Sequence, residues 1–190
     1  MSENETYTDP RIIKTHRAIR EAFVDLLHEK PFAQIAVQDI LDRAPVNRST
    51  FYKYYSGKSD LAGKMIADFK AEYSRYILTR FQAGSFDVFL NMMPEASDWI
   101  HSRRLILALW KVDTRRHHLY RDMHKLIKQQ FLRFAHTLPN TDPGKDWDYQ
   151  ADMLATLILG SMNYFFSRDL PLRLPEVRQA WAEMSQLLLL

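Results

Sequence analysis

The chain has 190 residues, 46% of them hydrophobic, with a formal net charge of +3 and no cysteine. This length suffices for one or two domains with a buried core, and the absence of cysteine excludes disulfides and cysteine-ligated zinc. No apolar run approaches the roughly 20 residues that a membrane helix needs, and the first residues are too polar for a signal peptide. A cytoplasmic protein without a membrane partner is therefore expected.

Glycine is scarce, with 5 residues, and no alternating β pattern extends over a useful length. Glycine and proline, which break helices, are widely spaced. The stretches between them are rich in leucine, alanine, lysine, arginine and glutamine, which is typical of an all-α protein. Residues 1–9 are expected to form a disordered N-terminal segment. A first helix is expected from about Pro10 to Glu29, because Pro10 suits a first helical turn and Pro31 follows the last apolar positions.

Residues 36–61 predict two short helices joined by a tight turn. Val37, Ile40 and Leu41 fall at i, i+3 and i+4, so they form one apolar helical stripe. Ala44 precedes Pro45 and is pushed out of the α region, which should end the first of these helices near Arg43.

The second short helix begins after Asn47, whose side-chain oxygen is expected to cap the backbone N–H near Thr50. Phe51 and Tyr55 are four residues apart and can both pack inward. The outward positions are then Arg48, Ser49, Tyr52 and Lys53. A helix that exposes these residue types from its first turns suits the DNA major groove, where it can reach base edges and phosphates.

The segment 11–66 resembles the DNA-binding domain of the tetracycline-repressor (TetR) family of bacterial regulators. In that family a helix ending in Ile-Ala-x-x-Ala-Gly-Val precedes a recognition helix, Ser/Asn-x-x-Thr-Phe/Leu-Tyr-x-Tyr/His-Phe, and then a long helix that starts with Ser-Lys-x-x-Leu. The matching residues are Ile40, Ala44, Val46, Asn47, Thr50, Phe51, Tyr52, Tyr54, Tyr55, Lys58 and Leu61. Pro45 replaces the usual turn glycine and cannot take a positive φ, so this turn must close differently.

The domain organisation follows from this resemblance and from the helix pattern. We expect a three-helix helix-turn-helix DNA-binding domain over 10–58, a linking long helix over 59–83, and a helical effector-binding and dimerisation domain over 84–190. The candidate DNA-binding residues are Gln38, Asn47, Arg48, Ser49, Thr50, Tyr52, Lys53, Tyr54 and Lys58. Lys58 is expected to hold a phosphate at the start of the long helix.

Charge is distributed unevenly along the chain. Residues 11–70 carry 11 Lys and Arg against 7 Asp and Glu, whereas the remainder carries 15 against 16. The basic excess therefore lies in the candidate DNA-binding part, as phosphate contact requires, although a solvated surface would look the same. Lys14, Arg17 and Arg20 can likewise contact a DNA backbone or be ordinary surface residues, and we favour the second interpretation.

The C-terminal part predicts helices at about 86–100, 102–112, 114–137, 146–168 and 174–189, the first of them kinked or split at Pro94. The last two helices are strongly apolar, more than a small monomer core needs. The resemblance implies that they pair across a two-fold axis in a homodimer. The candidate interface residues are Leu157, Ser161, Tyr164, Phe165, Trp181, Met184 and Leu188.

A small-molecule effector is the other implied partner. Its candidate site consists of Trp99, Arg103, Leu107, Trp110 and Met123, although apolar residues at helical spacing more often belong to a plain core than to a ligand site. Asp113 and His117 lie at i and i+4, but no third ligand is evident, so neither a metal nor a cofactor is predicted.

The sequence lacks the motifs of common enzymes. Gly57-Lys58-Ser59 imitates the end of a phosphate-binding loop, but the upstream glycine and strand are missing, and no Gly-x-Ser-x-Gly motif occurs. The prediction is a non-enzymatic, dimeric, sequence-specific repressor that a small molecule releases from a palindromic operator on double-stranded DNA. The alternative is a regulator with the same fold that responds to a protein partner.

Overall fold

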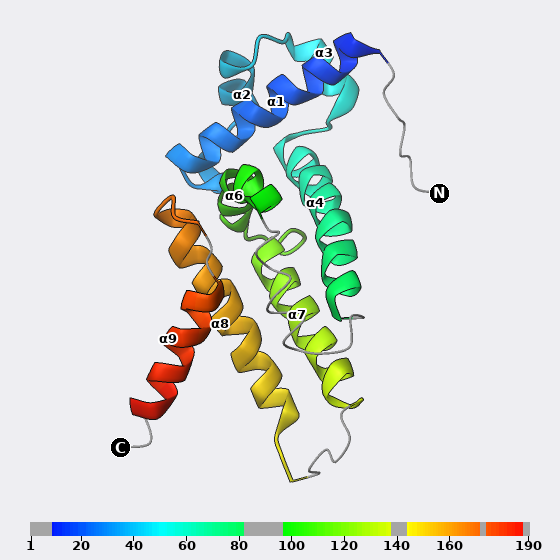
Figure 1. Ribbon diagram of the computed structural model, residues 1–190. Coiled ribbons are helices and arrows are strands. Elements are labelled where there is room, and N and C mark those ends of the chain that lie inside the picture. The colour runs from blue at the N-terminus through cyan, green and yellow to red at the C-terminus, as the bar shows by residue number, and fades with distance from the viewer. Residues whose placement is uncertain (1–8, 82–96, 138–143, 172–173, 188–190) are drawn as a thin grey trace. The chain divides into compact units, whose positions relative to one another are not determined.

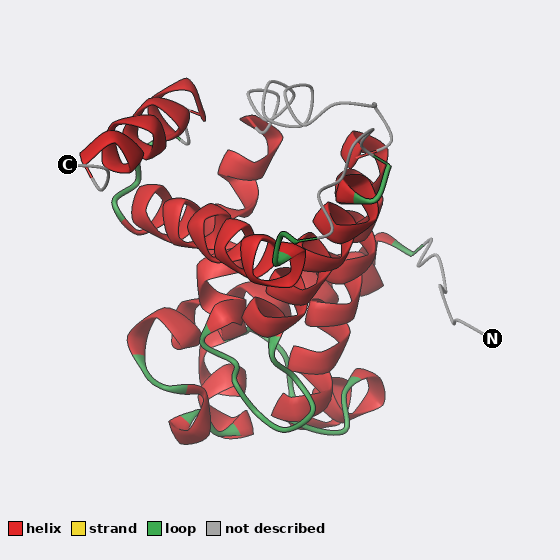
Figure 2. Ribbon diagram, turned by 90° about the horizontal axis from the view of Figure 1, so that it is seen from below, coloured by secondary structure: helices red, strands yellow, loops and turns green. Residues whose placement is uncertain are grey.

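A computed structural model of the chain describes residues 9–81, 97–137, 144–171 and 174–187 (Figure 1). Their regular elements are α1 (Pro10–Glu29), the 3₁₀ turn η1 (Phe32–Gln34), α2 (Val37–Arg43), α3 (Arg48–Tyr54), α4 (Lys58–Phe81), α6 (Ser97–Trp110), α7 (Leu119–Ala135), α8 (Trp147–Ser167) and α9 (Leu174–Leu187). Figure 2 shows only helices and loops in these ranges, which confirms the all-α prediction. None of the described helices combines the length and apolarity that crossing a bilayer requires.

The described residues fall into two compact units. The first contains the chain up to Phe69 together with Ala108–Leu119, and the second contains Lys70–Leu107 together with the chain from Tyr120 onward. Helices α4 and α6 therefore contribute residues to both units. The sequence did not indicate that Ala108–Leu119 groups with the N-terminal helices.

Helix α1 has the predicted bounds, and its ends show why. The Asp9 side chain accepts a hydrogen bond from the Arg11 backbone N–H at 2.8 Å, and Pro10 occupies the first turn, where its missing N–H costs nothing. After Glu29 the chain turns extended at Lys30. The buried face of α1 consists of Ile19, Ala22, Phe23, Val24, Leu26 and Leu27.

The turn between α2 and α3 closes without glycine. Ala44 is extended, with φ −86° and ψ 134°, as expected for a residue before proline. The Val46 backbone N–H then donates to the Ala44 carbonyl at 2.7 Å, which reverses the chain across Pro45. Thus the turn closes around Pro45 through this hydrogen bond, without a residue at positive φ.

The first unit has one core beneath α1, α2 and α3. Its largest fully buried side chains include those at the inner positions of each helix: Ile19, Phe23, Leu27, Ile35, Ile40, Phe51, Tyr55 and Leu61. Because these positions come from four helices and η1, the core fixes the short helix α3 against α1 and α4. Burial of one such side chain is worth about 1.5–3 kcal/mol.

Two predicted helix boundaries are wrong. Helix α6 begins at Ser97 and runs through residues 100–102, where a break was expected; the predicted helix at 86–100 lies mostly outside the described residues. Helix α7 begins at Leu119 rather than 114, because residues 113–118 form a turn. In that turn the Thr114 N–H donates to the His117 carbonyl at 2.8 Å, and Asp113 pairs with His118 in an isolated β-bridge.

Helices α8 and α9 lie close to their predicted bounds. The Asp146 side chain caps α8 by accepting from the Tyr149 N–H at 2.9 Å. At the other end Asp169 adopts φ 59°, the left-handed conformation in which a short polar residue can end a helix. An ion pair from Arg103 on α6 holds the Asp169 carboxylate.

Candidate nucleic-acid interface

Helix α3 has a buried face and an exposed face, divided as predicted. Phe51 and Tyr55 are fully buried and anchor the helix in the core. The side chains of Arg48, Ser49, Tyr52 and Lys53 are exposed, and Tyr52 keeps 47% of its surface accessible. A short helix therefore presents two cations, a hydroxyl and a phenol on one rigid face.

Asn47 is the N-cap of α3, as predicted. Its Oδ1 accepts hydrogen bonds from the Thr50 backbone N–H and from the Ser49 hydroxyl, both at 2.8 Å. The cap fixes the first turn of the helix, which carries Arg48 and Ser49. Because Oδ1 is already engaged, Asn47 contributes to this surface first by holding the helix terminus.

Gln38 on α2 orients Arg48. The Arg48 Nη2 donates to Gln38 Oε1 at 2.5 Å, and Gln38 Nε2 donates to Asp42 Oδ1 at 2.7 Å. Gln38 thus holds one nitrogen of the Arg48 guanidinium, and the other N–H donors of this exposed side chain remain available. The predicted residues on the two short helices form a single cluster.

A polar network ties the end of α3 to α1 and α4. The Tyr55 hydroxyl lies 2.7 Å from His16 Nδ1 and accepts from Arg20 Nε at 3.4 Å, and Arg20 Nη2 donates to Asp68 at 2.7 Å. The His16 ring also contacts the Tyr54 ring, with centroids 4.4 Å apart. Burial lowers the pKa of His16, and the nearby positive charges of Arg20 and Lys64 lower it further.

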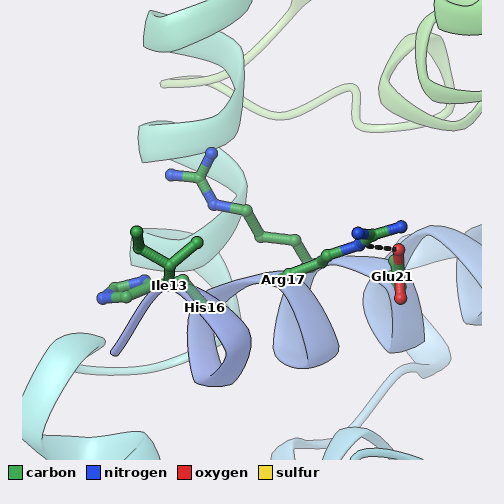
Figure 3. Close-up of a pocket in the computed structure, with 5 residues that line it drawn as sticks. Ile13, His16, Arg17 and Glu21 are labelled. Carbon is green, nitrogen blue, oxygen red and sulfur yellow. Dashed lines mark hydrogen bonds and ion pairs between the residues drawn. The ribbon is translucent and has the colours of Figure 1, made fainter. Parts of the chain in front are cut away.

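The outer side of this network is an open pocket of about 360 Å³ on α1 (Figure 3). Ile13, His16, Arg17, Arg20 and Glu21 line it. Arg17 forms an ion pair with Glu21 at 2.7 Å. Arg20 forms an ion pair with Asp68 and donates a hydrogen bond to the Tyr55 hydroxyl. Both arginines therefore have partners within the domain, consistent with the interpretation of them as surface residues.

Lys58 has a role that the sequence did not predict. Its ammonium group donates to the carbonyls of Phe32, Ala33 and Ile35 at 2.9, 3.0 and 2.6 Å and lies 4.8 Å from the centre of the Phe32 ring. An ammonium group has three N–H donors, and each has a carbonyl here. This geometry disagrees with the expected phosphate contact and makes Lys58 a clamp between α4 and η1.

The candidate effector residues have varied environments. Met123 is buried, Leu107 and Trp110 are half-buried, Arg103 is ion-paired with Asp169, and the Trp99 side chain lies outside the described residues. Trp110 belongs to the first compact unit and the other described candidates to the second. Among the described residues no His, Asp and Glu side chains are grouped so as to hold a metal ion.

The candidate dimer residues on α8 and α9 include exposed apolar side chains. Tyr164 and Met184 keep 51% and 48% of their surface accessible. Leu157, Ser161, Phe165 and Trp181 are half-buried, and Leu188 lies outside the described residues.

Sequence reasoning missed a basic groove in the first unit, between the first turns of α4 and residues 114–117. The sequence predicts a helix over 114–137, whereas residues 114–117 form a turn that lines the groove opposite α4. The adjacent Arg115-Arg116 pair was the available signal.

Comparison with known proteins agrees with this geometry. Residues 19–65 match the family of bacterial regulatory proteins, tetR family. The HTH-type transcriptional regulator YxbF of Bacillus subtilis (strain 168) is 26% identical over 168 residues, which is 85% of this chain and 42% of the relative. YdeS of the same organism is 46% identical over 50 residues, 26% of this chain and 25% of the relative. The chain thus spans less than half the length of these relatives.

Two crystal structures share the fold. A gamma-butyrolactone receptor (ArpA-like protein) superposes with a TM-score of 0.62 at 15% identity, covering 90% of this chain and all of that one. The regulatory protein TetR from Rhodobacter sphaeroides gives a TM-score of 0.55 at 18% identity, covering 89% and 97%. The chain thus shares the fold of these two proteins and carries a helix-turn-helix in α2 and α3. The match to the tetR family covers residues 19–65, about a quarter of the chain.

Proposed function

We propose that the chain is a transcriptional regulator that reads a palindromic operator in double-stranded DNA with the exposed face of α3. The observation that carries this proposal is the division of α3: Phe51 and Tyr55 are fully buried, while Arg48 and Lys53 are exposed. A helix anchored in this way can enter the major groove as a rigid body. Its site of action is then the chromosome in the cytoplasm.

We assign the proposed operator contacts to two groups of residues, those that reach base edges and those that reach phosphates. Arg48, oriented by Gln38, has free donors suited to a guanine edge, and Ser49 and Thr50 lie in the same first turn. Lys53 and Tyr52 are placed to reach phosphates. Tyr54 is a weaker candidate, because its ring contacts His16. Lys58 is not included, since its donors are used by three carbonyls.

A homodimer through α8 and α9 would match a palindromic operator. Two recognition helices must lie about one duplex turn apart, roughly 34–36 Å, to enter successive major grooves. The exposed Tyr164 and Met184 support such an interface, because large apolar side chains at half exposure gain free energy when a partner covers them.

Release from the operator is proposed to follow binding of a small molecule among the side chains of α6 and α7. Arg103 could neutralise an anionic group there, but it would first have to leave Asp169. One relative, from Lactococcus lactis subsp. lactis (strain IL1403), is named an activator of the dhaKLM operon, so a reporter assay rather than homology must fix the sign of regulation.

The direct experiment uses the non-coding DNA beside the gene. Gel-shift titration should give saturable binding to an inverted repeat there, and Arg48→Ala should reduce the preference over random duplex. Equal binding of both duplexes by the wild-type chain would overturn the proposal. If binding is specific but no compound in a metabolite screen releases the operator, a protein partner replaces the small molecule as the signal.

A further inference from the structure

The groove beside α4 is built entirely within the first unit. One wall consists of the turn before α4 and its first turns, and the other of residues 114–117. The volume is about 750 Å³, which lies in the range of small-molecule sites. Its lining residues are Ser56, Ser59, Asp60, Gly63, Lys64, Ala67, Thr114, Arg115, Arg116 and His117.

The charge of this lining is unbalanced. It contains the cations Lys64, Arg115 and Arg116 and a single carboxylate, Asp60. That carboxylate is already engaged, because it accepts from the Ser56 backbone N–H at 2.9 Å and lies 3.4 Å from the Lys64 ammonium. The two arginines remain: among the described residues neither side chain has a hydrogen-bonding or ionic partner.

The arginines are held at the groove by the turn that carries them. The Thr114 hydroxyl accepts from the backbone N–H groups of Arg116 and His117 at 3.3 and 2.9 Å. The His117 ring is in turn seated against the α4 backbone at Gly63. The exposed hydroxyls of Ser56 and Ser59 stand on the opposite wall. Two arginines and two serines thus line one space together with Lys64, whose ammonium also donates to the Tyr54 carbonyl at 2.9 Å.

We propose that this groove binds a phosphate-bearing ligand. The guanidinium groups of Arg115 and Arg116, which have no partner among the described residues, match the several oxygens of a phosphate better than the two oxygens of a single carboxylate, because each planar fork can donate two parallel hydrogen bonds. The excess positive charge balances a dianion. The phosphate belongs either to a free metabolite or to the backbone of a bound duplex, since Ser56 lies only two residues beyond the end of α3.

The test uses pyrophosphate as the probe, with no DNA present, so its result does not depend on the proposed operator. Isothermal titration of the full chain at low salt should show one saturable site. The double variant Arg115→Gln/Arg116→Gln should weaken that binding at least tenfold. A control with the same charge change, Lys125→Gln/Arg133→Gln on exposed positions of α7, should leave it unchanged. Thermal melts of both variants check that they fold.

A second measurement identifies the source of the phosphate. The salt dependence of duplex binding should lose about two ions in the groove variant if the groove holds DNA backbone, and none if it holds a metabolite. The proposal is overturned if the groove variant and the α7 control behave alike in both the pyrophosphate and the duplex titrations.

Discussion

Gly63 and His117 are in such close contact that a side chain at position 63 would meet the imidazole ring. A Cβ atom built on Gly63 would lie 2.6 Å from Cε1 of His117, 3.0 Å from Nε2 and 3.3 Å from Nδ1. The imidazole therefore rests on the α4 backbone, and a methyl group at Gly63 must displace it. Gly63 lies inside a helix, where alanine is otherwise preferred by about 0.5–1 kcal/mol.

The first prediction is a double-mutant cycle at this contact. Gly63→Ala should stabilise the His117→Ala variant by about 0.5–1 kcal/mol, because helix propensity acts without the clash. In the wild-type background the same substitution should be neutral or destabilising, since the ring must move. Urea unfolding of the four proteins measures both effects. Additivity within about 0.3 kcal/mol would show that the two residues do not interact.

The second prediction separates direct reading from orientation. Arg48→Ala should cost about 1–3 kcal/mol of operator affinity with no change in melting temperature, because its side chain is exposed and makes no core contact. Gln38→Ala should cost less, since it removes only the 2.5 Å hydrogen bond that orients the guanidinium. Fluorescence anisotropy with operator and random duplex measures both. Unchanged operator binding by Arg48→Ala would mean that α3 does not face the bases.

The third prediction concerns Lys58 and Lys53, two lysines with opposite roles. Lys58→Met keeps the stem and removes the three hydrogen bonds to carbonyls, so the free energy of unfolding should fall by about 1–3 kcal/mol. The salt slope of DNA binding should not change. Lys53→Met should leave stability unchanged and reduce that slope by about one ion. If the two variants exchange these behaviours, Lys58 contacts phosphate after all.

The contrast between these lysines shows what the sequence could predict. The bounds of α1 and the cap of α3 depend on neighbours within four residues, such as Asp9 with Arg11 and Asn47 with Thr50, and both were predictable. The partners of Lys58 lie 23 to 26 residues away, so no local pattern marks them. The turn before α7 was missed because it contains no glycine or proline; its geometry comes from the Thr114 hydroxyl and from contact with α4.

The fourth prediction is a pH dependence that arises from His16. Its folded-state pKa is below the ordinary 6.5, mainly because of burial and then because of Arg20 and Lys64. The unfolded chain therefore binds a proton first as the pH falls below about 6.5, and stability should decrease on acidification from that point. The contribution is fully present above this pH.

His16→Gln should flatten the loss of stability between pH 7.5 and 5, measured by urea unfolding at several pH values. His136→Gln is the matched control, since His136 is exposed at the end of α7. An equal slope in the wild type and in His16→Gln would assign the acid sensitivity to other groups.

The fifth prediction concerns the dimer interface. Tyr164 and Met184 keep about half of their surface accessible in the single chain, so replacing either with glutamate should not disturb its core. In a dimer through α8 and α9 the same substitutions would bury an unpaired carboxylate, which costs several kcal/mol. Sedimentation velocity at micromolar concentration should therefore show a wild-type dimer and monomeric Tyr164→Glu and Met184→Glu variants, all with the same helical content by circular dichroism.

Ile13→Glu is the control, because Ile13 on α1 is 51% exposed and lies outside the proposed interface. That variant should remain a dimer. Since a palindromic operator needs two recognition helices held together, the monomeric variants should also lose operator affinity while keeping weak, salt-sensitive binding to any duplex. A monomeric wild type, or dimers that tolerate glutamate at both positions, would move the interface away from these helices.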